Sequence, residues 1–161
     1  VTKVVTALLA PIGKVKIPAT SKFKASDHFT TNSKAVRIAW LGDNFQQHFL
    51  SKVEESQSRF TLRVSQLKKV SLDQPIRDEL GKSHEETTLA TVWELLKKQP
   101  NGEPGKLLTN GYVNIFYVRD AQGVFWAVDV RWLSYGWLVD AYSVEYPHGW
   151  REGYQVFSRN S

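Results

Sequence analysis

Apolar and polar positions alternate in short runs along most of this chain, and the runs predict strands and helices in mixed order. Residues 34–42 and 59–72 alternate with the period of a half-buried strand. Residues 44–56 and 84–98 instead repeat their apolar positions with helical spacing, and residues 73–81 carry the cap residue, proline and glycine that bracket a short helix. This order favours an α+β fold in which two or three helices pack on a sheet.

Three strand patterns follow in series near the C-terminus. They read YVNIFYVRD, GVFWAVDVRW and GWLVDAYSVEY, and the turn segments DAQG and LSYG separate them. Short runs joined by such turns predict a three-stranded antiparallel meander. The aromatic tail, residues 147–161, is expected to pack back as an edge segment.

The two hairpins of the meander place acidic residues in the middle of a sheet. A turn at LSYG puts Asp129 directly opposite Asp140, with Arg131 one step along on the same face. A turn centred on DAQG puts Asn114 opposite Asp129 from the other side, which predicts a polar row across three strands. We expect the helix at 84–98 to cover part of this face.

Two carboxylates that face each other across strands repel, and burial increases the cost. One interpretation is functional, with Asp129 and Asp140 as catalytic candidates that share a proton or bind a cation. The other is structural, with Arg131 and lysines bridging the acids on a solvated half of the sheet.

Aromatic residues beside the polar row suggest a contact surface. Trp137 and Tyr142 join Asn114, Arg131 and the two aspartates as candidate binding residues. The WLSYGW segment with Tyr146 and Trp150 could also form a stacking platform, and core packing is the alternative for these rings.

Motifs of catalysis and of cofactor binding are missing from the chain. It has no cysteine, which excludes disulfides, thiolate catalysis and cysteine-ligated metals. GEPGK departs from a phosphate-binding loop in its spacing and in the residue after the lysine. SHEETT lacks a second histidine at ligand spacing, and the four histidines are scattered. We therefore expect no cofactor and no metal site.

Charge divides the chain into a basic arm, residues 1–34, and a neutral globular domain, residues 35–161. The arm holds six lysines and one acid, and it is rich in Ser and Thr. Such a segment could bind nucleic acid, or it could be a solubilising leader. No run is long and apolar enough for a membrane span, so we expect no membrane partner. The lack of cysteine favours a cytoplasmic location, with a processed or secreted chain as the alternative.

Several strings in the C-terminal half are distinctive, above all LLTNG, NIFYVRD and VFSRN. From about Ala35 onward the chain resembles an uncharacterised family of small hypothetical proteins from candidate-phyla bacteria. That resemblance implies a bacterial origin and brings no activity with it. A curved, cone-like sheet as in NTF2-like domains is a fold-level analogy.

These observations favour a small non-enzymatic binding or protein-interaction domain, with a protein or small ligand bound over the sheet. The alternatives are a pocket-type ligand-binding domain or enzyme that uses Asp129 and Asp140, and nucleic-acid binding through the basic arm.

Overall fold

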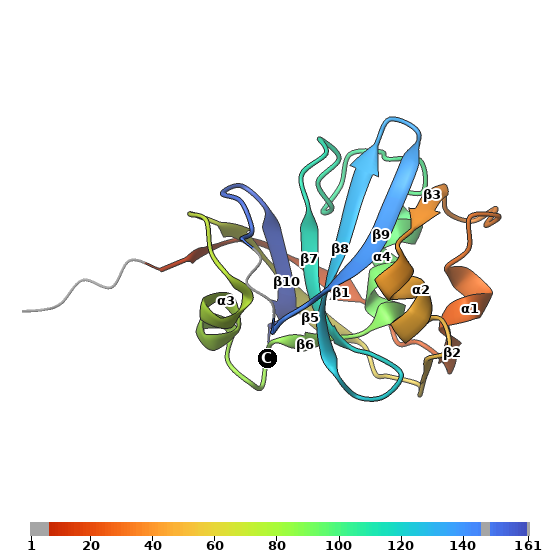
Figure 1. Ribbon diagram of the computed structural model, residues 1–161, viewed down its shortest axis with the longest axis horizontal. Coiled ribbons are helices and arrows are strands. Elements are labelled where there is room, and N and C mark those ends of the chain that lie inside the picture. The colour runs from red at the N-terminus through yellow and green to blue at the C-terminus, as the bar shows by residue number, and fades with distance from the viewer. Residues whose placement is uncertain (1–6, 146–148, 161) are drawn as a thin grey trace, which may run out of the picture.

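The computed structural model describes residues 7–145 and 149–160, which form ten strands and four helices (Figure 1). The strands are β1 (Leu9–Ile17), β2 (Phe23–Lys24), β3 (Ile38–Leu41), β4 (Val53–Glu54), β5 (Phe60–Leu67), β6 (Glu86–Thr87), β7 (Asn114–Arg119), β8 (Phe125–Leu133), β9 (Gly136–Ser143) and β10 (Gln155–Arg159). The helices are α1 (Ala25–His28), α2 (Asp43–Phe49), α3 (Asp73–Leu80) and α4 (Leu89–Lys98).

Eight of the strands form one sheet, whose order is β1-β5-β10-β7-β8-β9-β3 with β6 also paired to β7. The pairs β7–β8 and β8–β9 are antiparallel, so the predicted C-terminal meander is confirmed. Strands β2 and β4 form a separate two-stranded sheet. The architecture confirms the predicted α+β class.

The C-terminal strand β10 lies inside the sheet, and the prediction of an edge segment is wrong. It pairs antiparallel with β5 on one side and parallel with β7 on the other. Its central residues Val156 and Phe157 are fully buried, one in each of the two cores. The strand therefore joins the N-terminal part of the sheet to the meander.

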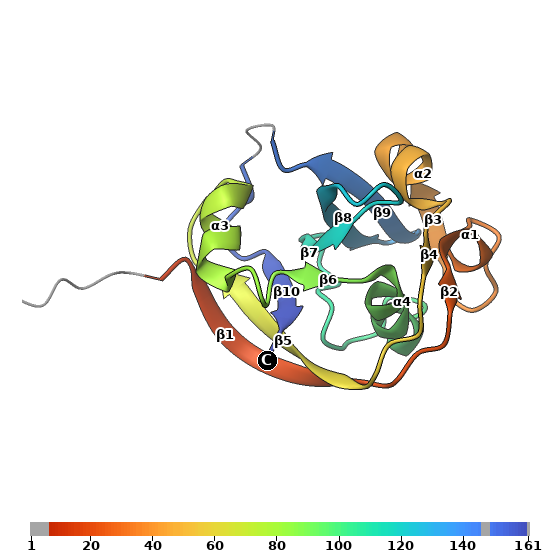
Figure 2. The same ribbon diagram turned by 90° about the horizontal axis from the view of Figure 1, so that it is seen from below.

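Each face of the sheet carries a hydrophobic core, because apolar side chains alternate to opposite sides of each strand. Figure 2 shows the sheet curving around α4, which lies on its inner side with α1 and α2 nearby, while α3 lies on the outer side. The inner core includes Phe45, Phe49, Trp93 and Val130. The outer core is smaller and packs Ile76 of α3 against the strands.

The described part of the expected basic arm is folded. Its residues 9–17 form β1, an edge strand paired with β5, and Phe23, Ala25 and Phe29 are buried in the inner core. Five lysines of this segment are exposed: Lys14, Lys16, Lys22, Lys24 and Lys34.

None of the helices in residues 7–145 and 149–160 has the length and apolar character needed to cross a membrane.

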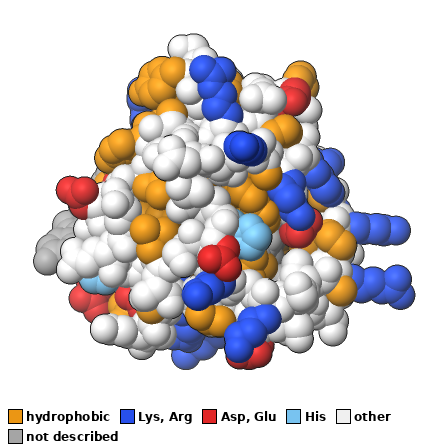
Figure 3. All heavy atoms as spheres, turned by 90° about the vertical axis from the view of Figure 1, so that its right-hand side faces the viewer, with side chains coloured by type: hydrophobic (Ala, Val, Ile, Leu, Met, Phe, Trp, Pro, Cys, Tyr) orange, Lys and Arg blue, Asp and Glu red, His pale blue; other side chains and the backbone are white. Residues whose placement is uncertain are grey.

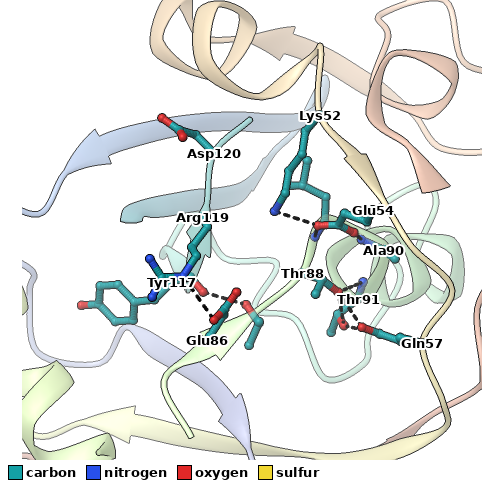
Figure 4. A network of polar contacts seen from close by, with 12 residues as sticks. Lys52, Glu54, Gln57, Glu86, Thr88, Ala90, Thr91, Tyr117, Arg119 and Asp120 are labelled. Carbon is teal, nitrogen blue, oxygen red and sulfur yellow. Dashed lines mark hydrogen bonds and ion pairs between the residues drawn. The ribbon is translucent and has the colours of Figure 1, made fainter. Parts of the chain in front are cut away.

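Helix α4 begins at Leu89, five residues later than the predicted helix 84–98, because a distant carboxylate caps it. Glu54 accepts hydrogen bonds from the backbone N–H groups of Leu89 and Ala90 at 2.8 and 2.9 Å (Figure 4). The Thr88 side chain accepts from Thr91 as the N-cap. The preceding residues form β6, which is hydrogen-bonded to β7.

Candidate functional site

The second hairpin brings the two aspartates together as predicted. Asp129 of β8 pairs with Asp140 of β9, and Arg131 pairs with Leu138 one step along on the same face. This confirms the predicted register between these strands. The face is the outer one, which α3 partly covers; α4 lies on the inner face, so the expectation that residues 84–98 cover the aspartates is wrong.

The first hairpin is shifted by one residue from the prediction, so Asn114 faces Val130 and not Asp129. The turn spans three residues between Asp120 and Val124, whose backbones bond at 2.7 Å, and Gly123 takes the left-handed conformation with φ of 85°. The Asp120 carboxylate accepts from the backbone N–H groups of Gln122 and Val124. A three-residue loop with glycine in this conformation is a common hairpin connection, and the single-residue shift reverses the face of every side chain on β7.

Asn114 consequently lies on the inner face and is fully buried. Its amide Nδ2 donates to the carbonyls of Leu108 and Val130, and its Oδ1 accepts from the Leu108 N–H at 2.9 Å. Gln155 of β10 also donates to Oδ1. The predicted polar row across three strands is wrong, and Asn114 instead ties the segment before β7 to the sheet.

Asp129 forms a two-point ion pair with Arg131. Nε of Arg131 lies 3.3 Å from Oδ1 and Nη2 lies 2.7 Å from Oδ2. Only 2% of the Asp129 side chain is exposed, against 36% for Arg131. Burial alone would lower the pKa of the Arg131 guanidinium, but the charge and hydrogen bonds of Asp129 raise it overall.

Tyr142 completes this cluster on β9. Burial raises the pKa of its phenol, and the negative charges of Asp129 and Asp140 raise it further, against the opposing effect of Arg131. A protonated phenol beside a fixed guanidinium is a pair of hydrogen-bond donors at the edge of the outer core. Both side chains are half-buried.

Asp140 turns toward the start of α2. Its Oδ1 accepts from the Ala141 N–H at 2.8 Å, and the Phe45 N–H in the first turn of α2 also bonds to the carboxylate. A side chain at Gly42 would overlap the carboxyl group of Asp140, so glycine permits this close approach. Burial raises the pKa of Asp140; the amides of Ala141 and Phe45 lower it, and the charge of Asp43 adds to the rise. Its position is that of a helix cap.

Two of the candidate aromatic residues lie in the cores. Trp137 is fully buried and donates from Nε1 to the Gln99 carbonyl at 2.8 Å, and Trp150 is 2% exposed. Neither ring offers an open face for stacking. Tyr146 lies outside the described residues. The tryptophan with the largest exposed fraction in the described part of the chain is Trp40, at 46%.

A buried polar cluster that the sequence pattern missed lies under α3. Asp73, the first residue of α3, accepts from the Tyr117 hydroxyl at 2.8 Å and from Nε1 of Trp150 at 2.7 Å. Burial and the neighbouring Asp73 carboxylate both raise the pKa of Tyr117 strongly. The sequence shows Asp73 only as a helix start, because its partners lie 44 and 77 residues away. The cluster fixes α3 to the outer core.

No group of three or more metal-ligating side chains lies close together within residues 7–145 and 149–160. His28 stacks on Phe23 with ring centres 4.5 Å apart, and burial lowers its pKa. His48 lies 3.8 Å from Asp120. The imidazole groups of the described histidines are thus dispersed, and His148 lies outside the described residues.

Neither Asp129 nor Asp140 lines any of four prominent surface hollows of about 220–460 Å³ in the described structure. One of about 410 Å³ lies between α1, β3 and α2, with Trp40 in its wall. Figure 3 views the molecule from the side of α1 and α2, where apolar and basic side chains are interspersed.

Comparisons with protein-family models, with curated proteins and with solved structures found no match to this chain.

Proposed function

We propose that this chain is a non-enzymatic binding domain and that its conspicuous acids are structural. The observation that carries the proposal is the ion pair of Asp129 with Arg131, in which the carboxylate is buried and faces a guanidinium from its own strand. A catalytic acid or base needs access to a substrate. Asp129 lacks that access, and the opposing Asp140 bonds to backbone amides.

In this proposal the binding surface is the outer face of the sheet. Arg131 and Tyr142 are half-buried on the outer face of β8 and β9, and we assign the contact with a partner to them. Arginine and tyrosine are enriched among the residues that dominate protein interfaces. Because Asp129 holds the guanidinium in place, little conformational freedom remains to be lost on binding.

The substitution Asp129→Asn tests this assignment through the free energy of unfolding. If the acid is structural, the variant loses the charge-assisted pair and should be less stable by about 1–2 kcal/mol in urea unfolding. An acid kept under strain for chemistry would give the opposite result, since its removal stabilises a protein or leaves stability unchanged. Unchanged or increased stability of Asp129→Asn would therefore restore the enzyme alternative.

A further inference from the structure

Two cations face each other across the first pair of strands. Lys14 of β1 pairs with Arg63 of β5, and Lys16 pairs with Thr61 one step along on the same face. Strand β1 is an edge strand of the sheet (Figure 2). Like charges directly opposite each other across strands are destabilising. An anion bound beside Lys14 and Arg63 would reduce this repulsion.

No such anion comes from the described part of the chain. None of its ion pairs includes Lys14, Lys16 or Arg63. Arg63 instead donates to the neutral Oδ1 of Asn160 at 3.3 and 3.4 Å. The row of cations is therefore not neutralised within residues 7–145 and 149–160.

The surface beside the row is hollow, and several side chains that line it are hydrogen-bond donors. A cavity of about 320 Å³ is lined by Lys14, Val15, Lys16, Thr61 and Asn160. The donors there include the ammonium groups of the two lysines and the Thr61 hydroxyl. Arg63 bonds only to Oδ1 of Asn160, which leaves the amide N–H groups of Asn160 as further donors. This donor set is complementary to an anion with several oxygens.

The same row continues to a buried hydroxyl. Ser158 of β10 pairs with Arg63 from the other side and is 1% exposed, yet its Oγ has no hydrogen-bond partner among the described residues. Buried hydroxyls are normally satisfied. The row Lys14–Arg63–Ser158 thus holds both an uncompensated charge pair and an unsatisfied polar atom.

We propose that this outer face of β1 and β5 binds the phosphate backbone of a nucleic acid. Lys14 and Lys16 lie two residues apart on one strand, about 6.6–6.8 Å along it, which suits successive phosphates of one strand. Lysine ammonium groups contact phosphates without reading bases, so the site has no sequence preference. The inference rests on the proposed function in one respect only, that the chain binds and does not catalyse.

The test is fluorescence anisotropy of a short labelled oligonucleotide, as a single strand and as a duplex, titrated with the whole chain over about 50–200 mM salt. The variant Lys14→Gln/Lys16→Gln/Arg63→Gln should bind at least about tenfold more weakly at the low-salt end, because three phosphate contacts are lost. The slope of log affinity against log salt should become shallower by roughly 2 for the single strand and 2.7 for the duplex.

A matched control keeps the net charge change equal. The variant Lys68→Gln/Lys69→Gln/Lys82→Gln also removes three cations, which are exposed and lie outside the row. It should retain nearly the wild-type affinity. Equal weakening of both variants would reduce the effect to net charge and overturn the site. Thermal unfolding of both variants checks that each is folded.

Two further titrations identify which source of phosphate the site prefers. Inorganic phosphate alone, and vesicles containing anionic phospholipid, are titrated under the same conditions. Absence of oligonucleotide binding at low salt overturns the proposal, whether or not either of these probes binds. Failure here is distinct from failure of the proposed function, which is decided by the stability of Asp129→Asn.

Discussion

The sheet contains two cross-strand pairs of like charge, and only one of them is compensated within the described residues. Asp129 and Asp140 face each other on β8 and β9, near one end of the sheet, and Lys14 and Arg63 face each other on β1 and β5 at the other. The acids turn apart, one to Arg131 and one to the first turn of α2. No carboxylate in the described structure forms an ion pair with Lys14 or Arg63. A pair compensated from within serves the fold, and an uncompensated pair is available to a ligand.

The largest expected effect comes from removing the cation that compensates Asp129. Arg131→Gln should lower the free energy of unfolding by about 2 kcal/mol, because the buried carboxylate loses its charged donor. Arg131→Lys keeps the charge but not the two-point geometry, so its loss should be smaller. Urea unfolding of both variants measures the difference, and equal stability of Arg131→Gln and the wild type would contradict the structural role.

The second acid should show the behaviour of a helix cap. Asp140→Ala removes the acceptor for the Ala141 and Phe45 amides and should cost about 1 kcal/mol of stability. Asp140→Asn keeps an acceptor oxygen at the same place and should cost much less. Thermal unfolding compares the two, and an equal loss in both variants would show that the negative charge, and not the hydrogen bonds, is what matters.

The basic pair predicts a gain of stability on substitution. Lys14→Glu replaces a like-charge neighbour of Arg63 by an opposite charge and should stabilise the chain by about 0.2–1 kcal/mol at low salt. Added salt should shrink the gain, because it screens exposed charges. Lys68→Glu, at an exposed position outside the row, is the control in the same urea titration. A loss of stability in Lys14→Glu would mean that Lys14 has a partner on the protein.

The smallest effect is the pH dependence contributed by Asp140. Burial raises the folded-state pKa of Asp140 above its ordinary value of 3.8, so the native state holds this proton more tightly than the unfolded state. Stability from this group is present below about pH 3.8 and is lost as pH rises through the folded-state pKa. Asp140→Asn lacks this loss, so its stability relative to wild type should rise with pH over that window. A difference that stays constant with pH would contradict the raised pKa.

Local signals predicted the meander, the α+β class and the opposition of Asp129 to Asp140, since a short turn fixes the register of its two strands. The same reasoning failed at Asn114 because DAQG permits loops of two or three residues, and the side-chain bonds of Asp120 select the longer one. The start of α4 depends on Glu54, 35 residues away, and the interior place of β10 depends on two distant strands. Contacts of this range leave no periodic trace in the sequence.

The interior position of β10 also sets an order of events for folding. Residues 155–159 hydrogen-bond to β5 on one side and to β7 on the other, so the sheet cannot become continuous before they have been synthesised. Chains that depend on such long-range pairing fold slowly and expose strand edges meanwhile. Until β10 inserts, β5 and residues 114–116 of β7 are open edges, and the chain is then most vulnerable to pairing with another copy of itself.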